Sequence, residues 1–447
     1  MRNRFKEYFE NTAIISEDIT YSYLELDSEV SSVLNKIKEQ NISSGKTVFL
    51  LSDYSFNAIA WLLALYENKN IVVPITSLIE KEIFERINSV AVDFIVNLRV
   101  NSISRIDEIK DRHKIIKKLN TENKSGLIIF SSGSTGKAKA MVHNMDNLVS
   151  AYLNKRIRKM TFMVFLMFDH IGGINTLFNC LATGATVVIP SKREPEEVIR
   201  LIDNYKVQIL PTSPTFLNLM LISGSLDKYD TSSLRMITYG TEVMQDTLLK
   251  RLKESFSRVK FLQTFGTSET GIIKSSSKSS NSTFIKLDDP DQEYKIVKGE
   301  LWLRSKTQVL GYMNHSMESF TEDGWFMTGD LVEQEGEYIK IKGRLKEVIN
   351  VGGEKVLPAE VENILLSHPF IKDCTVHGET SPITGQTVIA SVSVNVEHDK
   401  KLIKKKLKSF CKDNMEAYKV PTKFKFVDAT EYSNRFKKVR NKNDEIS

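Results

Sequence analysis

A short segment rich in hydroxyl groups, glycine and lysine follows an apolar run in the first third of the chain. Residues 127–130 read Leu-Ile-Ile-Phe, and residues 131–139 read Ser-Ser-Gly-Ser-Thr-Gly-Lys-Ala-Lys. A loop at the end of a strand can present backbone N–H groups, hydroxyls and ammonium groups to a phosphate, and glycine lets the backbone approach it closely. The expected phosphate ligands are Ser132, Gly133, Ser134, Thr135, Gly136, Lys137 and Lys139.

The spacing of this segment differs from that of the common P-loop. Gly133 and Gly136 are only three residues apart, and Ala138 follows Lys137. The P-loop instead requires Gly-x-x-x-x-Gly-Lys-[Ser/Thr]. The sequence therefore indicates another way of holding a triphosphate, and the alternative interpretation is an ordinary Ser/Gly turn.

Further loops with glycine, hydroxyl, acidic and basic residues follow in order along the chain. Three of them read Phe-Asp-His-Ile-Gly-Gly at 168–173, Tyr-Gly-Thr-Glu at 239–242 and Gln-Thr-Phe-Gly-Thr-Ser-Glu-Thr-Gly at 263–271. The next read Gly-Trp-Phe-Met-Thr-Gly-Asp-Leu at 324–331, Lys-Gly-Arg-Leu-Lys-Glu-Val-Ile at 342–349 and Gly-Gly-Glu-Lys at 352–355. The tail reads Asn-Arg-Phe-Lys-Lys-Val-Arg at 434–440.

The elements that must position these loops alternate between helical and extended patterns. Apolar runs at 186–190, 208–211, 236–238 and 261–263 each end in a loop with Pro, Gly, Ser or Thr. Strand–helix alternation favours an open, mostly parallel sheet layered with helices. Because ligands bind at the carboxyl ends of such strands, we expect these loops to meet at one crevice.

The pattern changes near residue 285. Residues 299–304 and 337–342 alternate with period two, which predicts a small antiparallel β region. A helix is expected to begin at Pro358, and the last hundred residues carry α/β patterns of their own, typical of a small lid-sized domain. The serine-rich stretch 275–282 is expected to be a loop.

The composition is that of a globular protein of two or three domains. Of 447 residues, 41% are hydrophobic and 26% are charged, and 62 basic against 56 acidic residues give a net charge of +6. No recognisable nucleic-acid-binding module accompanies this small basic excess. The widely spaced Cys180, Cys374 and Cys411 argue against a disulfide framework or metal cluster and favour the cytoplasm. No apolar stretch approaches the roughly 20 residues that would span a bilayer.

The ordered motifs resemble those of the adenylate-forming superfamily, which comprises acyl-CoA synthetases, peptide-synthetase adenylation domains and luciferases. The resemblance covers residues 15–440, and the sequence of residues 351–362 is most similar to the acid–CoA ligase branch. It implies an α/β fold: a large N-terminal α/β domain of layered sheets with a small β region, then a small mobile α+β C-terminal domain. The expected boundaries are 1–344 and 345–447, with a hinge near Lys346.

The resemblance also assigns roles around ATP. Glu269 would hold Mg²⁺ on the phosphates, and Phe265 would stack on adenine opposite the loop at 240–242. Asp330 would accept both ribose hydroxyls, and Arg344 would be the second ribose or phosphate contact, unless the two form only a surface ion pair. The other residues expected around ATP are Gly240, Thr241, Glu242, Thr264, Gly266, Thr267 and Ser268.

The catalytic lysine of the family is expected in the tail. Lys437 fits best because Arg440 follows it at the Lys-x-x-Arg spacing, although Phe436 replaces the expected glycine and Lys438 is a competing choice. With Lys437, the residues expected to act in catalysis are Glu269, Thr135 and His170.

The acyl and thiol sites follow from the same resemblance. His170 would mark the acyl pocket together with Gly240 and Gly271, unless it is only a packed, hydrogen-bonded histidine. Gly352 and Gly353 would line the tunnel through which the thiol enters.

The implied reaction joins an acid to a thiol at the expense of ATP. The acid and ATP give acyl-AMP and pyrophosphate, and a thiol, in first place CoA, then accepts the acyl group. A stand-alone adenylation enzyme that loads an acyl carrier protein is the alternative, and a non-catalytic nucleotide-binding scaffold is a remote one. The short region before residue 127 favours a small or medium organic acid over a long fatty chain.

Overall fold

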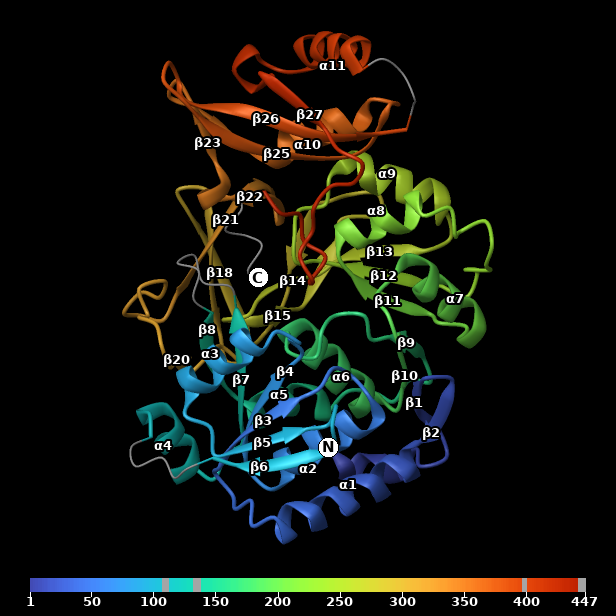
Figure 1. The fold of residues 1–447 in the computed structure, drawn as a ribbon, viewed down its shortest axis with the longest axis vertical. Helices are drawn as coiled ribbons and strands as arrows, with labels where there is room; N and C mark the ends of the chain where they lie inside the picture. The colour runs from blue at the N-terminus through green and yellow to red at the C-terminus, as the bar shows by residue number, and fades with distance from the viewer. Residues whose placement is uncertain (107–111, 132–137, 396–399, 441–447) are drawn as a thin grey trace.

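Two sheets of seven strands each form the centre of the molecule (Figure 1). The computed structural model describes residues 1–106, 112–131, 138–395 and 400–440, and all elements below lie in these ranges. In order, the first sheet contains β13 (Lys260–Gln263), β12 (Met236–Tyr239), β11 (Ile209–Thr212), β9 (Thr161–Met163), β10 (Thr186–Ile189), β1 (Thr12–Ser16) and β2 (Ile19–Ser22). The second contains β20 (Gly311–Tyr312), β8 (Lys139–Asn144), β7 (Gly126–Ser131), β4 (Ile71–Ile75), β3 (Thr47–Leu51), β5 (Phe94–Asn97) and β6 (Ser102–Arg105).

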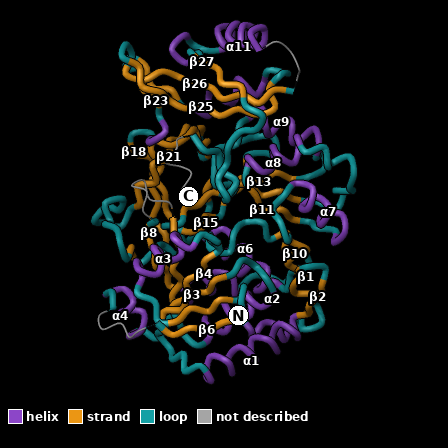
Figure 2. The backbone as a smooth tube through the Cα atoms, in the orientation of Figure 1, coloured by secondary structure: helices purple, strands orange, loops and turns teal. Residues whose placement is uncertain are grey.

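Helices lie between the two sheets and on both outer faces (Figures 1 and 2). The helices that share one apolar core with both sheets are α1 (Tyr23–Glu39), α2 (Phe56–Glu67), α5 (Met145–Leu153) and α6 (Ile171–Thr183). Those on the outer face of the second sheet are α3 (Glu80–Val90) and α4 (Lys114–Thr121). Those on the outer face of the first are α7 (Pro195–Tyr205), α8 (Pro214–Ile222) and α9 (Asp246–Ser255). The expected layered α/β architecture is confirmed.

Local sequence explains where these helices begin and which of their faces are buried. At the start of α1, Ser22 Oγ accepts a hydrogen bond from Glu25 N–H at 3.1 Å, and the Glu25 carboxylate accepts from Ser22 N–H at 2.6 Å. This capping box satisfies two backbone donors that the helix itself cannot pair. In α2, residues 58–65 are all buried, as expected of a helix that is apolar all round and lies between two sheets.

The predicted antiparallel β region is present as a third sheet of six strands. Its order is β16 (Ser275–Ser277), β17 (Ile285–Leu287), β22 (Tyr338–Arg344), β21 (Phe326–Glu335), β19 (Glu300–Ser305) and β18 (Gln292–Val297). The prediction of a loop at 275–282 is wrong for the first three residues, which form β16. These three residues pair with β17, and Ser275 Oγ also donates to the Gln263 carbonyl at 2.8 Å. A run of serines can form a strand because strand pairing uses backbone groups.

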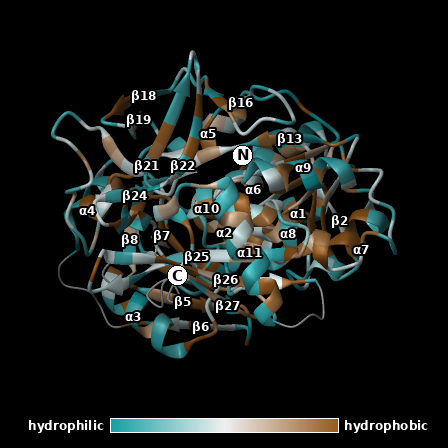
Figure 3. Cartoon of the chain, turned by 90° about the horizontal axis from the view of Figure 1, so that it is seen from above, coloured by the Kyte–Doolittle hydropathy of each residue, from teal (hydrophilic) through white to brown (hydrophobic). Residues whose placement is uncertain are grey.

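The last part of the described chain forms a separate apolar core around a five-stranded sheet. Its strands are β24 (Glu354–Val356), β23 (Ile349–Val351), β26 (Gly385–Val394), β25 (Ile371–Ser381) and β27 (Lys423–Phe426). The helices that pack on it are α10 (Pro358–Ser367), which begins at the predicted proline, and α11 (Lys400–Asn414). Figure 3 shows hydrophobic segments gathered in the strands and central helices of the molecule. Among the described helices, none is long and apolar enough to cross a bilayer.

Candidate active site

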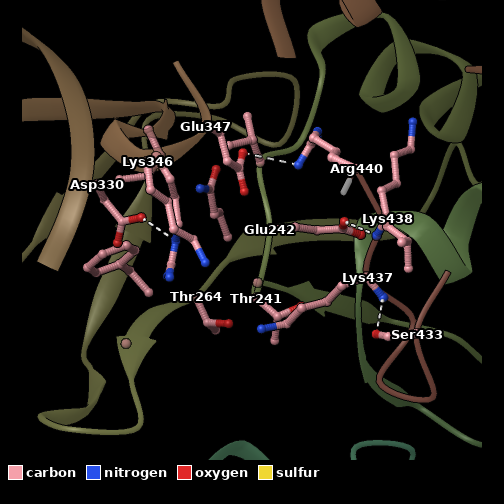
Figure 4. Close-up of a pocket in the computed structure, with 18 residues that line it drawn as sticks. Thr241, Glu242, Thr264, Asp330, Lys346, Glu347, Ser433, Lys437, Lys438 and Arg440 are labelled. Atoms are coloured by element: carbon pink, nitrogen blue, oxygen red, sulfur yellow. Dashed lines mark hydrogen bonds and ion pairs between the residues drawn. The ribbon is translucent and has the colours of Figure 1, made fainter. Parts of the chain in front are cut away.

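A pocket of about 160 Å³ lies where the antiparallel sheet, the loop after β12 and the C-terminal tail meet (Figure 4). Residues from several separate motifs line it. Those expected from the sequence are Gly240, Thr241, Glu242, Thr264, Phe265, Gly266, Asp330, Arg344, Lys346 and Lys437. Lys438 and Arg440 of the tail motif also line it, as do Glu347 and Ser433, which were not expected at the site.

Close backbone packing holds the two loops of one wall together. Thr264 N–H donates to the Tyr239 carbonyl at 2.8 Å, which joins the ends of β12 and β13. A Cβ on Gly240 would lie 2.8 Å from the Thr264 carbonyl oxygen, and one on Gly266 would lie 2.5 Å from the Gly271 carbonyl oxygen. Only glycine fits at both positions, and so the half-buried Phe265 is presented at the pocket wall in β14 (Phe265–Thr267).

Asp330 and Arg344 face each other across paired strands β21 and β22. Arg344 Nε lies 3.0 Å from Asp330 Oδ1, and the side chains are 45% and 6% exposed respectively. Burial raises the pKa of Asp330 against the opposing effect of Arg344. The carboxylate is therefore buried at the pocket wall, which a simple surface ion pair does not require.

The carboxylate of Glu242 is committed to protein contacts. Its Oε1 accepts from Thr215 N–H at 2.7 Å, and its Oε2 accepts from Lys438 N–H at 3.3 Å. Burial raises the pKa of this group. Glu242 therefore connects the start of α8 to the C-terminal tail.

Glu269 lies in the turn between β14 and β15 (Gly271–Ile273). Tyr312 Oη donates to its Oε1 at 3.2 Å, and the ammonium of Lys139 lies 5.6 Å from the centre of the Tyr312 ring. Tyr312 thus connects Glu269 to the last residue of the predicted phosphate loop. None of the sequence motifs includes Tyr312.

Other expected ATP-site residues are placed as follows. The Thr267 hydroxyl lies 3.0 Å from that of Thr270 and accepts from Thr270 N–H, so it stabilises the turn that carries Glu269. Ser268 lies in the same turn and is half-buried. The phosphate-loop residues that lie outside the described ranges are Ser132, Gly133, Ser134, Thr135, Gly136 and Lys137.

The donor set around Glu269 fits a magnesium ion that arrives with a nucleotide. Within the described ranges, no group of three or more His, Cys, Asp or Glu side chains is arranged to hold a metal. Mg²⁺ commonly binds through only one or two carboxylates together with substrate phosphates. The half-buried Glu269 carboxylate is sufficient for that mode.

Lys437 and Lys438 point in different directions (Figure 4). The side chain of Lys437 extends into the pocket, where burial, with Arg344 and Arg435, lowers its pKa to about 8. Lys438 Nζ instead donates to the Cys374 carbonyl at 2.6 Å and lies 3.1 Å from Asp373. Of the two candidates, Lys438 is held by partners in the C-terminal sheet, whereas Lys437 extends into the pocket.

Phe436 adopts a backbone conformation that glycine adopts most readily. Its φ is +52°, in the left-handed region. The ring lies 5.2 Å from that of Phe165 and 5.0 Å from that of Phe216, and it stacks on Tyr432 at 5.4 Å. Ser213 Oγ donates to the Phe436 carbonyl at 2.8 Å. The residue therefore anchors the tail in the apolar core of the first sheet.

His170 is both hydrogen-bonded and directed at cavities. As the N-cap of α6, its Nδ1 accepts from Gly172 N–H at 3.1 Å. Burial, with Arg435 and Lys437, lowers its pKa well below the usual value, so the ring is neutral and its proton lies on Nε2.

Two small cavities adjoin His170. One of about 10 Å³ also contacts Arg435 and Lys437, and one of about 50 Å³ also contacts Gly240 and Thr241. Gly271, which was expected at the acyl pocket, does not line the larger cavity, whereas its neighbour Ile272 does.

The residues expected to act in thiol transfer lie on the C-terminal side of the pocket. Gly352 and Gly353 form the turn between β23 and β24, with φ values of +61° and +97°. They do not line the pocket in this structure. Lys346 lies in the short 3-10 helix η2 (Leu345–Glu347), between the antiparallel sheet and the C-terminal sheet, and does line it.

Comparison with known proteins establishes the fold and the family. The structure of the anthranilate CoA ligase AuaEII, solved with anthranoyl-AMP, aligns with a TM-score of 0.81 at 21% identity, over 98% of this chain and 95% of that chain. This likeness shows the adenylate-forming fold, with a large N-terminal and a small C-terminal domain. Residues 1–313 match the AMP-binding enzyme family, and residues 360–437 match the AMP-binding enzyme C-terminal domain. The chain belongs to the AMP-binding enzyme family.

Relatives include several proteins named as CoA ligases. The "Probable CoA ligase CCL5" of Humulus lupulus is 31% identical over 327 residues, which are 66% of this chain and 59% of that protein. The 2-succinylbenzoate–CoA ligase of Bacillus licheniformis is 30% identical over 325 residues, which are 67% of this chain and 66% of that protein. The chain thus spans about three fifths to two thirds of these relatives' lengths.

Proposed function

We propose that this protein uses ATP to convert a small or medium organic acid to acyl-AMP and then transfers the acyl group to the thiol of CoA. The observation that carries the proposal is the meeting of Lys437 with the Asp330–Arg344 pair in one pocket. These residues come from distant segments of the chain, and together they offer an ammonium group, a guanidinium group and a buried carboxylate. A ribose and an α-phosphate require this combination of acceptor and cations.

The chemistry of the first half-reaction explains why cations must be concentrated here. A carboxylate oxygen attacks the α-phosphorus, the new P–O bond forms, and the bond to pyrophosphate breaks. Two anions must approach each other, so positive groups fixed beside the reacting atoms stabilise the transition state. Lys437 and Arg344 serve this role, and Mg²⁺ held by Glu269 would neutralise charge on the β- and γ-phosphates when bound.

His170 supports the binding of the acid. Its neutral ring keeps a proton on Nε2, because Nδ1 already accepts from Gly172 N–H. The ring can therefore donate to a substrate carboxylate at the mouth of the cavity that it shares with Thr241.

The size of this cavity favours a compact acid. Its volume is about 50 Å³, and its wall contains Leu166, Pro211 and Ile272. Relatives are named for 2-succinylbenzoate and anthranilate, so carboxylic acids with a single aromatic ring are the first candidates. Long-chain fatty acids are expected to be poor substrates.

The second half-reaction is proposed to need another arrangement of two domains. The domains are residues 1–344 and 345–447, with the hinge at Lys346, which lies between the antiparallel sheet and the C-terminal sheet. Rotation would withdraw Lys437 and bring Gly352 and Gly353 to the thiol. CoA is favoured as the acceptor because the relatives are named as CoA ligases, and a carrier protein is the second candidate.

An acid-dependent exchange of labelled pyrophosphate into ATP tests the proposal. We expect exchange with aromatic acids of one ring, and formation of the acyl-CoA thioester, seen by mass spectrometry, once CoA is added. Exchange without a CoA thioester, but with loading of a phosphopantetheinylated carrier protein, would favour that acceptor. Nucleotide binding without exchange for any acid in a broad panel would contradict the proposed activity.

A further inference from the structure

Thr241 lies where the candidate nucleotide pocket and the two cavities beside His170 meet. It lines all three spaces, and Figure 4 shows it on the pocket wall with Thr264 and Lys437. A side chain in this position can contact both a nucleotide and an acid bound next to it.

The backbone of Thr241 is strained. Its φ of +73° lies in the left-handed region, where a β-branched side chain is a rare outlier. Its neighbours fix this conformation, because Gly240 N–H donates to the Thr212 carbonyl at 3.4 Å and Glu242 is bound at both carboxylate oxygens. Such strain is unfavourable and clusters at ligand-binding positions. A glycine would avoid it.

The hydroxyl of Thr241 is also unsatisfied. Thr241 Oγ1 is buried and has no hydrogen-bond partner among the described residues. The adjacent Thr264 hydroxyl, by contrast, donates to the Tyr239 carbonyl at 3.2 Å. A buried hydroxyl without a partner is unfavourable, so Thr241 carries two costs that no described contact offsets.

The charges around this hydroxyl indicate what it binds. Lys437 and Arg435 contribute positive charge to the small cavity that Thr241 shares with His170, and the described residues that line this cavity include no acidic side chain. An anionic oxygen is the acceptor that such surroundings favour.

We propose that Thr241 is a substrate-binding residue whose hydroxyl donates a hydrogen bond to the carboxylate of the acid substrate. It holds the oxygen that does not attack, which leaves the other oxygen free to form the bond to the α-phosphorus as pyrophosphate departs. No proton transfer is needed, and the same hydrogen bond then holds the carbonyl oxygen of the acyl-AMP. This inference rests on the proposed acid-activating function.

Three substitutions separate the hydroxyl from the shape of the side chain. Thr241→Val keeps the branched shape without the hydroxyl, Thr241→Ser keeps the hydroxyl, and Thr241→Gly removes both the side chain and the strain. In the pyrophosphate-exchange assay we expect Thr241→Val and Thr241→Gly to lose about tenfold or more in kcat/KM for the acid, as for a lost charge-assisted hydrogen bond. The KM for ATP should stay within about twofold, and Thr241→Ser should retain most of the activity.

A matched control removes another buried hydroxyl. Thr183→Val, near the end of α6, loses a hydrogen bond from Thr183 Oγ1 to the Asn179 carbonyl, and should leave the KM for the acid unchanged. Wild-type exchange with an unaltered acid KM in Thr241→Val overturns the inference alone. Equal losses in Thr241→Val and Thr241→Ser also overturn it, since a structural role would then suffice. Absence of exchange in the wild type for every acid overturns the proposed function, and this inference with it.

Discussion

At the scale of single residues, the protonation state of Lys437 is the property on which the proposed reaction most depends. The residue could be chosen from the sequence by the spacing to Arg440, but Lys438 has the same chemistry and lies one position away. Only the folded environment separates them, because one ammonium group enters the pocket and the other pairs with Asp373. The committed carboxylate of Glu242 and the role of Tyr312 were beyond prediction for the same reason: long-range contacts determine them.

The lowered pKa of Lys437 predicts a pH dependence. Since this pKa is about 8, the ammonium form is lost as the pH rises through 8, and with it the positive charge beside the reacting phosphate. We expect kcat/KM for ATP in the exchange assay to fall above about pH 8. In Lys437→Arg the cation persists to higher pH, so the fall should disappear. A wild-type profile that stays flat from pH 7 to 10 would contradict this prediction.

Removing the positive charge of Lys437 altogether should slow the reaction. Lys437→Met should slow acyl-AMP formation by a factor of about 10² or more, as for other groups that stabilise a transition state. Nucleotide affinity, measured by calorimetry, should change much less. An equal loss of affinity and rate would show that Lys437 binds the ground state only.

At the scale of elements, the tail segment 432–440 shows how a departure from a motif can be accommodated. The sequence predicted the strand–helix alternation, the antiparallel sheet and the start of α10, because periodicity and proline are local signals. It could not predict the order of strands in each sheet, or that Phe436 would keep a left-handed φ and pack against Phe165 and Phe216.

Shortening the Phe436 side chain should loosen the tail without unfolding the protein. Phe436→Ala is expected to lower kcat of the exchange reaction about tenfold or more, because Lys437 is then held less firmly, while the KM for ATP changes little. Phe436→Leu, which still fills the space with apolar atoms, should restore much of the rate.

Phe256→Ala is the matched control for that change. Phe256 is 3% exposed in the same apolar cluster but does not line the pocket. It should reduce the urea midpoint of unfolding while kcat stays near that of the wild type. Equal effects of the two alanine variants on kcat would show that general core packing, and not the tail, controls the rate.

At the scale of the whole molecule, a buried group of charges fixes the tail to the C-terminal sheet. Glu362 in α10 is fully buried and lies 3.0 Å from Arg440, and Lys438 lies between Glu362 and Asp373. Although burial opposes it, Arg440 and Lys438 hold the pKa of Glu362 below its usual value. The charge of Glu362 therefore stabilises the fold above its usual pKa, and this contribution is lost as the pH falls through the lower folded value.

Neutralising the Glu362 carboxylate should lower the stability of the protein far more than neutralising an exposed carboxylate. Glu362→Gln removes the fully buried charge that faces Arg440 and Lys438, which then keep Glu347 and Asp373 as partners, and is expected to lower the free energy of unfolding by about 3–5 kcal/mol. Glu335→Gln breaks the exposed pair with Lys278, whose side chain is 42% exposed, and should cost less than about 1 kcal/mol. Urea denaturation at pH 7 measures both. Similar losses for the two variants would contradict a stabilising role for the buried group.

Two residues of the tail that are separated by only one position, Phe436 and Lys438, are bound to different parts of the molecule. The Phe436 ring and carbonyl are bound by the core of the first sheet, while two residues later Lys438 is bound by the sheet of the last hundred residues. Only Lys437 separates these two attachments, and because one residue spans at most about 3.6 Å, they cannot move far apart. If the small domain rotates as proposed, the contacts of the Phe436 ring with Phe165 and Phe216 would have to break for Lys438 to stay attached, and Lys437 would leave the pocket with them. The same rotation that prepares the transfer to the thiol would thus remove Lys437 from the pocket and stop the formation of acyl-AMP.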